Sequence, residues 1–237
     1  MPGAGAGGIP AAARPLITDV STIELDIYSD VICPWCYIGK RKMEIALDRH
    51  AQAGGPPVAV RWRPFLLNPD YRGPSRPTAD YLAERFGAGA ASMAGRVTAV
   101  AADVGLHYRM DRSLVADTRR AHQLSDAAYA EGGAAAQGAV TEALLSAHFI
   151  EGLDVADDAV LESIGRSAGL SDRAVDRVLH DPDASAEIEH EIAHARAIGV
   201  TAVPTFVVGA RYGVSGAQDP SVLLDLLRRG SAESADG

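Results

Sequence analysis

Residues 29–40 read Ser29-Asp30-Val31-Ile32-Cys33-Pro34-Trp35-Cys36-Tyr37-Ile38-Gly39-Lys40, and they contain both cysteines of the chain. An apolar run that includes Ile23 and Ile27 precedes them and predicts a strand, and residues 40–50 have a helical pattern. Pro34 falls in the predicted first turn of that helix, where proline is well accepted because the N–H that it lacks would have no intrahelical acceptor. The sequence therefore predicts a strand that leads into a helix whose first turn holds two thiols.

The C-x-x-C spacing at a helix N-terminus favours thiol–disulfide chemistry. The nucleophile of disulfide exchange is the thiolate, and the unpaired N–H groups of a helix N-terminus stabilise an anion. We therefore expect Cys33 to be the exposed, attacking thiol. Cys36 lies one turn further into the helix, so we expect it to be less accessible and to resolve a mixed disulfide formed at Cys33.

Length and composition describe an ordinary globular protein. The 237 residues suffice for one large domain or for a domain with a sizeable insertion, and 47% of them are hydrophobic. A formal net charge of −9 argues against nucleic acid and against an anionic membrane as partners. Residues 1–17 lack the basic start and the apolar core of a secretory signal, and no apolar run reaches the ~18 residues of a membrane span. We therefore expect a cytoplasmic protein with no membrane partner.

Two β-containing ends flank a long helical middle. The predicted strands lie at residues 22–28, 58–62, 203–208 and 211–214. The predicted helices of the middle lie at residues 79–86, 90–104, 115–130, 134–149, 157–168, 171–180 and 183–198. Asp157 and Ser171 are predicted N-caps, and a last helix is predicted at residues 221–229. The order is therefore β-α-β, a helical block, and then β-β-α.

Three segments carry a resemblance to a known family. They are SDVICPWCYIGKRKME at 29–44, RWRPFLLNP at 61–69 and GVTAVPTFVVGARYGVSGAQ at 199–218. In this order they resemble the DsbA-like branch of the thioredoxin superfamily, in particular FrnE-type oxidoreductases. The resemblance implies an α/β protein with a thioredoxin fold and a large all-helical insertion between its βαβ and ββα halves. It also implies dithiol–disulfide chemistry at the CPWC motif.

The resemblance and the pattern together predict the domain organisation. The predicted parts are a flexible tail at 1–20, a thioredoxin-like domain at 21–72 and 197–230, a helical insertion domain at 73–196 and a disordered tail at 231–237. The insertion is expected to cover part of the active-site face or to form the contact of a homodimer.

Val203 and Pro204 are the substrate-binding residues that the resemblance implies. By this match Pro204 corresponds to the cis-proline that faces the active-site disulfide, and Val203 lies beside the sulfurs. The backbone N–H and C=O of Val203 would then pair with an extended substrate, a form of β-augmentation. The alternative is an ordinary trans proline at the start of a strand.

Two carboxylates are candidates for an acid–base role beside the resolving cysteine. Asp30 lies three residues before Cys33, and Asp26 lies on the first predicted strand. A cap or a loop hydrogen bond is an equally good interpretation of each. Thioredoxin and DsbA carry an acid at the position that Ile27 occupies here, so this sequence departs from the family pattern.

Two further residues support the predicted site. Lys40 lies on the same helix face as Cys36, where it either favours the thiolate slightly or is simply solvated. Pro34 and Trp35 separate the cysteines and tune their reduction potential. Trp35 is expected to be exposed and to contact apolar substrates.

No metal site is predicted. His190 and His194 match the H-E-x-x-H pattern, but Ile188 and Ile192 lie on the opposite side of the helix, so the histidines belong to a solvated face. A zincin would need a third ligand, and no histidine follows His194. The two cysteines alone cannot complete a structural zinc site.

The predicted function is that of a thiol–disulfide oxidoreductase or isomerase acting on protein or small-molecule thiols and disulfides. It needs no cofactor beyond the Cys33–Cys36 disulfide, with glutathione as a possible co-substrate. One competing hypothesis keeps the fold and resembles the kappa-class glutathione transferases and 2-hydroxychromene-2-carboxylate isomerases, although these carry serine at the attacking position. A second hypothesis is a non-redox accessory protein of a secondary-metabolite pathway, and a third is a metal hydrolase at His190 and His194.

Overall fold

The computed structural model describes residues 22–234 with the exception of residue 88. The predicted tail at 1–20 and the last three residues lie outside the described part of the chain. The prediction of a disordered tail is wrong for residues 231–234, because helix α8 (Pro220–Ser234) extends through them. The helix continues past Gly230, which packs so closely on Val208 and Ile23 that a Cβ there would lie 2.3 Å from Val208 Cγ1.

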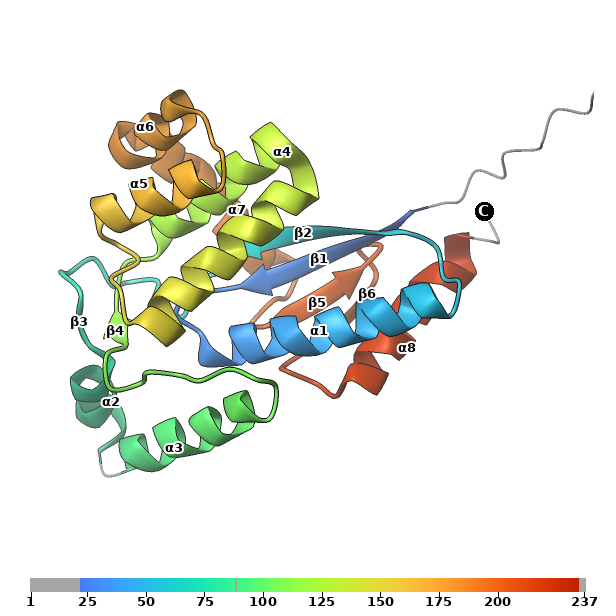
Figure 1. Cartoon of the computed structure of the whole chain (residues 1–237), viewed down its shortest axis with the longest axis horizontal. Coiled ribbons are helices and arrows are strands. Elements are labelled where there is room, and N and C mark those ends of the chain that lie inside the picture. The colour runs from blue at the N-terminus through green and yellow to red at the C-terminus, as the bar shows by residue number, and fades with distance from the viewer. Residues whose placement is uncertain (1–21, 88, 235–237) are drawn as a thin grey trace, which may run out of the picture.

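A four-stranded mixed sheet joins the two ends of the chain, as predicted (Figure 1). Its strand order is β2-β1-β5-β6, with bounds Val58–Pro64, Ile23–Ser29, Thr205–Val208 and Tyr212–Ser215. Strands β1 and β2 are parallel, whereas β5 is antiparallel to both β1 and β6. The central pair β1 and β5 therefore brings residues near the two termini into direct contact.

Helix α1 (Pro34–Gln52) packs beside α8 against this sheet (Figure 1). The side chains between them form an apolar core whose largest fully buried members are Leu25, Ile27, Met43, Phe206 and Leu223. Together, β1-α1-β2 and β5-β6-α8 form a thioredoxin-like unit, as predicted from the order of the elements.

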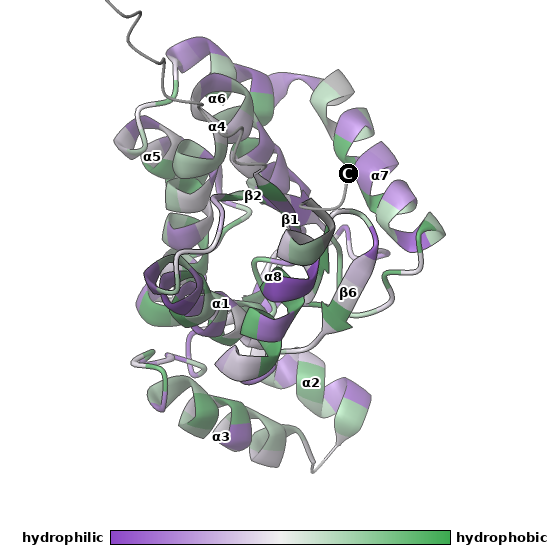
Figure 2. Cartoon of the chain, turned by 90° about the vertical axis from the view of Figure 1, so that its right-hand side faces the viewer, coloured by the Kyte–Doolittle hydropathy of each residue, from purple (hydrophilic) through white to green (hydrophobic). Residues whose placement is uncertain are grey.

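The remaining elements lie between β2 and β5 in the sequence. They are β3 (Arg76–Pro77), α2 (Thr78–Phe86), α3 (Gly89–Ala102), β4 (Leu114–Val115), α4 (Arg119–Ser146), the π-helix η1 (Ala147–Glu151), α5 (Asp158–Ser167), α6 (Asp172–His180) and α7 (Pro182–Ala197). Helices α4 and α7 contact β2, whereas α3 contacts α1 and is coloured mostly as apolar in Figure 2. None of the described helices is long and apolar enough to cross a lipid bilayer.

The insertion is mostly but not entirely helical. Strands β3 and β4 form a short antiparallel pair that the sequence pattern does not predict, because each contributes only two residues. Asp157 and Ser171 cap their helices through side-chain oxygens, as predicted. The boundaries of the insertion domain at residues 73 and 196 stay a prediction.

Candidate active site at the start of helix α1

Cys33 is the N-cap of α1, and Pro34 is the first residue of the helix. The backbone of Cys33 is extended, with φ −87° and ψ 112°. Its N–H donates to the Asp30 carbonyl at 3.0 Å, and its own carbonyl accepts from the Cys36 N–H at 3.0 Å. Both cysteines are free thiols. This geometry places Cys33 at the N-terminal end of the helix, where the first N–H groups have no intrahelical acceptor.

Both thiols are buried, which corrects one prediction. The side chain of Cys33 is only 3% exposed, although the motif predicts an exposed sulfur there. Tyr28, Phe65 and Val203 pack around it in one apolar cluster, and Phe65 and Val203 come from segments that no local pattern connects to the motif. Cys36 is fully buried beneath Cys33, as predicted for the less accessible thiol.

Burial gives the two cysteines different surroundings. Desolvation and the neighbouring Cys33 sulfur raise the pKa of the Cys36 thiol well above its ordinary value. The Ser29 hydroxyl and the Asp30 backbone act in the opposite direction, because they favour the thiolate. Cys36 is therefore held as a neutral thiol beside polar groups that can assist its ionisation.

Val203 lies directly over the Cys33 thiol. Its carbonyl accepts from Cys33 Sγ at 3.7 Å, and the peptide bond between Val203 and Pro204 is cis. Gly39 makes this approach sterically possible, since a Cβ at that position would lie 2.8 Å from Pro204 Cγ. Sequence reasoning missed this role of Gly39, although a glycine inside a predicted helix signals a close approach of another element.

An apolar cleft of about 410 Å³ opens beside Cys33. Four large hydrophobic side chains that line it are unusually exposed, namely Trp35, Leu67, Phe86 and Met93. Trp35 is 41% exposed, in agreement with the prediction. Arg85 also lines the cleft, where its guanidinium donates to the Tyr81 hydroxyl at 2.9 Å. The cleft can receive an apolar group next to Cys33.

Comparison with known proteins now identifies the family. The family profile of the DsbA-like thioredoxin domain matches residues 24–228. The chain belongs to this family. A probable DsbA oxidoreductase from Streptomyces coelicolor is 32% identical, with a TM-score of 0.80 over 89% of this chain and 91% of that one. The residues that the family profile matches include α1 and the four strands of the main sheet, except for Ile23.

Two more distant structures share the fold of this DsbA-like chain. One is 2-hydroxychromene-2-carboxylate isomerase, which is 19% identical and has a TM-score of 0.65 over 90% of this chain and 98% of that one. The other is the cytosolic disulfide reductase DsbM of Pseudomonas aeruginosa with GSH, which is 19% identical and has a TM-score of 0.58 over 90% of this chain and 98% of that one. The uncharacterized protein YwbO of Bacillus subtilis is 40% identical over 48 residues, which span about a fifth of its length (21%) and 20% of this chain.

Tyr108 is a residue of the DsbA-like site that sequence reasoning missed. Its hydroxyl donates to the Pro34 carbonyl at 2.7 Å, between the two cysteines. Burial raises the pKa of Tyr108, and its ring stacks on Phe149 with centroids 4.7 Å apart. The residue therefore ties the first turn of α1 to the insertion, and no local signal in the sequence indicates this contact.

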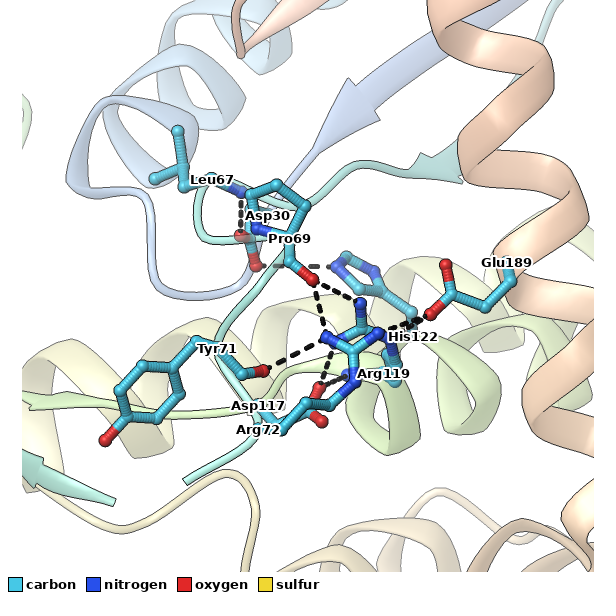
Figure 3. Close-up of polar contacts among 9 residues, drawn as sticks. All are labelled: Asp30, Leu67, Pro69, Tyr71, Arg72, Asp117, Arg119, His122 and Glu189. Atoms are coloured by element: carbon cyan, nitrogen blue, oxygen red, sulfur yellow. Dashed lines mark hydrogen bonds and ion pairs between the residues drawn. The ribbon is translucent and has the colours of Figure 1, made fainter. Parts of the chain in front are cut away.

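The two candidate carboxylates have different partners. Asp26 forms an ion pair with Arg63 at 2.6 Å near the protein surface. Asp30 is completely buried, and one of its oxygens accepts from the Leu67 N–H at 2.8 Å (Figure 3). Its other oxygen faces His122 Nε2 at 3.4 Å. Asp30 is thus the carboxylate that lies within the buried surroundings of the cysteines.

Lys40 is neither solvated nor free to act on a thiolate. Its ammonium is buried and forms ion pairs with Glu44 and with Glu142, the latter at 2.7 Å. Arg41 binds the same two carboxylates. These carboxylates balance the charge of Lys40, so its function is to hold α1 against α4.

His190 and His194 are exposed on α7, while Ile188 and Ile192 are buried beneath them. The predicted solvated face is therefore confirmed. Within residues 22–234, leaving out residue 88, no group of three or more His, Cys, Asp or Glu side chains is arranged to hold a metal ion.

Proposed function

We propose that the protein catalyses thiol–disulfide exchange as a FrnE-type oxidoreductase, with Cys33 as the nucleophile and Cys36 as the resolving thiol. The observation that carries the proposal is the position of the CPWC pair. Cys33 is the N-cap of α1 beside an apolar cleft, and Cys36 is sealed beneath it. Helix N–H groups stabilise the attacking thiolate, and the cleft offers a place for the substrate.

The reaction needs only the two thiols and a substrate disulfide. Cys33 attacks one substrate sulfur, a mixed disulfide forms, and the other substrate sulfur leaves as a thiolate that takes a proton from solvent. Cys36 then loses its proton and attacks Cys33 Sγ. The Cys33–Cys36 disulfide forms, and the second substrate sulfur leaves. The substrate gains the two electrons that the protein dithiol loses, and the reverse sequence oxidises a substrate dithiol.

Val203 supports the docking of a substrate chain. Its carbonyl already lies 3.7 Å from Cys33 Sγ, so an extended peptide that pairs with this backbone would bring its own cysteine to the attacking thiol. Trp35 and the other exposed apolar side chains of the cleft would then contact the residues that flank that cysteine.

The proposal is tested by titrating the protein in glutathione redox buffers while recording tryptophan fluorescence, since Trp35 lies between the two cysteines. We expect a single two-electron transition at a potential in the range of roughly −270 to −120 mV, and we expect Cys36→Ser to retain a stable mixed disulfide on Cys33 by mass spectrometry. A wild-type protein without the transition, or a Cys36→Ala variant with the same transition, contradicts the proposal.

Glutathione is the small-molecule thiol that we propose as co-substrate in a cytoplasmic setting. The name of the similar DsbM structure describes a cytosolic reductase with GSH, and the cleft here is large enough for a tripeptide. A glutathione-dependent isomerase or transferase is the second candidate, because an isomerase shares the fold. In that case glutathione-dependent turnover would survive Cys36→Ser, whereas disulfide exchange would not.

A further inference from the structure

Helix α2 forms one wall of the apolar cleft beside Cys33, and none of its nine side chains is buried. Its residues that line the cleft follow the spacing i, i+3, i+4, i+7 and i+8, and they are Thr78, Tyr81, Leu82, Arg85 and Phe86. A helix normally packs a stripe of this spacing into a protein core. On α2 the stripe faces the cleft instead, so a ligand in the cleft would cover it.

Arg85 is the charged group of this stripe. Among the described residues that line the cleft, no other Asp, Glu, Lys, Arg or His side chain is present. The neighbouring carboxylate on α2, Glu84, is bound by Arg76. Within the described part of the chain no carboxylate forms an ion pair with Arg85. The positive charge of Arg85 is therefore available to a ligand in the cleft.

Two hydrogen bonds fix the direction of the Arg85 guanidinium. The Tyr81 hydroxyl donates to Asn68 Oδ1 at 2.8 Å, which leaves its oxygen to accept from Arg85 Nη1 at 2.9 Å. The guanidinium carbon also lies 5.9 Å from the centroid of the Phe86 ring. A guanidinium has five N–H donors and binds a carboxylate through two parallel bonds. Arg85 is thus a positioned cation that still has donors to offer.

The rest of the cleft suits an apolar group. The hydroxyls of Thr78 and Ser113 bond to each other at 3.0 Å, and Ser113 also bonds to His148 at 3.2 Å. Most of the other lining side chains are apolar, among them Ile32, Leu67, Met93, Val97, Met110 and Phe149. A polar ligand group in contact with these side chains would lose its hydration without a compensating bond. The cleft volume of about 410 Å³ lies within the range of about 300–1,000 Å³ that is typical of small-molecule sites.

We propose that Arg85 selects the substrates of the Cys33–Cys36 pair, and that these are small-molecule thiols or disulfides in which an apolar group carries a carboxylate. The proposal rests on the thiol–disulfide exchange proposed above and leaves its bond changes and electron balance as they are written there. The substrate sulfur lies at Cys33, the apolar group covers the stripe of α2, and the carboxylate accepts from the Arg85 guanidinium. Arg85 contacts neither reacting sulfur, so it acts on substrate binding.

The test uses two aromatic disulfides with the same skeleton. In the first each ring carries a nitro group and a carboxylate, and in the second a carboxamide replaces the carboxylate. Cys33 of the reduced protein attacks either reagent and releases a nitrothiophenolate, which absorbs visible light. Stopped-flow traces over a range of reagent concentrations give the second-order rate constant, the apparent binding constant and the limiting rate. One ionic strength is used throughout, so that the long-range effect of the net charge of −9 stays constant.

We expect Arg85→Met, which keeps an unbranched apolar stem, to slow the carboxylate reagent relative to the carboxamide reagent about fivefold, the worth of an ion pair that stays in contact with solvent. The loss appears in the binding constant and not in the limiting rate. Arg85→Lys keeps the charge but not the two parallel donors, so it recovers part of the ratio. The matched control is Arg96→Met, because Arg96 is exposed on the neighbouring helix α3 and does not line the cleft. It should leave the ratio at its wild-type value.

The outcomes separate this selection from the function on which it rests. A reduced wild-type protein that releases thiolate from neither reagent overturns the proposed exchange and the selection together. A wild type that reacts with both reagents, with a ratio that folded Arg85→Met reproduces, overturns the selection alone. The selection is also overturned if Arg96→Met lowers the ratio as much, because the effect is then one of overall charge.

Glutathione disulfide separates the two halves of the selection, because it carries carboxylates on a polar body. We expect Arg85→Met to slow its reaction with Cys33 less than that of the aromatic carboxylate. An equal loss for the two disulfides shows that Arg85 binds carboxylates without regard to the rest of the molecule, and it overturns the selection for an apolar group. Thermal unfolding by circular dichroism establishes that each variant is folded.

Discussion

At the scale of single residues, the two cysteines differ more in surroundings than their spacing suggests. Cys33 borders the apolar cleft and contacts the Val203 carbonyl, whereas Cys36 has no exposed surface and faces Ser29. In the exchange that we propose, a substrate in the cleft would reach Cys33 and not Cys36, so access would set the order of the two chemical steps.

His148 provides a test of buried charge in acid. Burial lowers the pKa of His148 from 6.5 to about 4. Between these pH values the histidine is protonated in the unfolded chain and neutral in the folded protein. Stability is intact above pH 6.5 and declines as the pH falls towards 4, by about 3 kcal/mol in total from this residue. Urea unfolding along a pH series measures the decline.

The variant His148→Gln keeps a partner for the Ser113 hydroxyl, but the glutamine side chain does not bind a proton in this pH range. Its free energy of unfolding should be lower than that of the wild type near pH 7 and should fall less steeply between pH 6.5 and 4. Parallel curves for the two proteins would show that His148 is not the source of the acid sensitivity.

The sequence predicts the residues whose signals are local. The C-x-x-C pair and its proline specify a helix N-terminus, and the strand that begins after Pro204 is recognisable through its flanking motif. His122 could not be found in this way, because its contact with Asp30 depends on how α4 packs against β2, the strand beside β1. The burial of Cys33 was missed for the same reason, since Phe65 and Val203 arrive from distant segments.

At the scale of elements, α1 can lie close to the strand that follows Pro204 because Gly39 has no side chain. A methyl group there would lie 2.8 Å from Pro204 Cγ and 3.2 Å from Phe206 Cζ, well inside van der Waals contact. The proline ring cannot rotate away as a flexible side chain could. The helix and the strand would have to separate, and with them Cys33 and Val203.

We expect Gly39→Ala to lower the free energy of unfolding by about 1–3 kcal/mol, as overpacking does in other cores. It should also slow the attack of Cys33 on a peptide disulfide, because the Val203 carbonyl moves away. The matched control is Gly95→Ala in α3, where nothing lies within 4 Å of the new methyl group. That variant should be neutral or more stable by up to ~1 kcal/mol, and equal effects of the two substitutions would refute the explanation.

Helix ends in the insertion were predictable where a side chain marks them. Asp157 and Ser171 accept N–H groups of their own first turns, a local contact that the sequence signals directly. The π-helix η1 and the β3–β4 pair have no comparable signature. Phe149 of η1 packs with Val97 and Ala101 of α3, and β3 pairs with β4 across a long stretch of chain, so only the tertiary structure could reveal these elements.

At the scale of the whole molecule, charge should select among small disulfides. The chain carries a formal net charge of −9, and that field repels anions that approach the cleft. We expect the reaction of Cys33 with anionic glutathione disulfide to accelerate roughly twofold between about 10 and about 200 mM salt, because salt screens the repulsion. Stopped-flow kinetics at several salt concentrations measure this.

The dicationic disulfide cystamine should show the opposite salt dependence, since the same field attracts it. If both reagents respond to salt in the same direction, the net charge does not govern approach, and the local charge of Arg85 at the cleft is the more important determinant.

The pairing of β1 with β5 also has a consequence for the protein as it is made. Cys33 and Val203 are 170 residues apart, so the thiols leave the ribosome long before the strand that covers them. At the usual rates of protein synthesis that interval lasts on the order of 10–30 s. During this time Cys33 lacks the Val203 contact that covers it in the folded protein, so a disulfide that reaches the nascent chain meets a site that is not yet assembled.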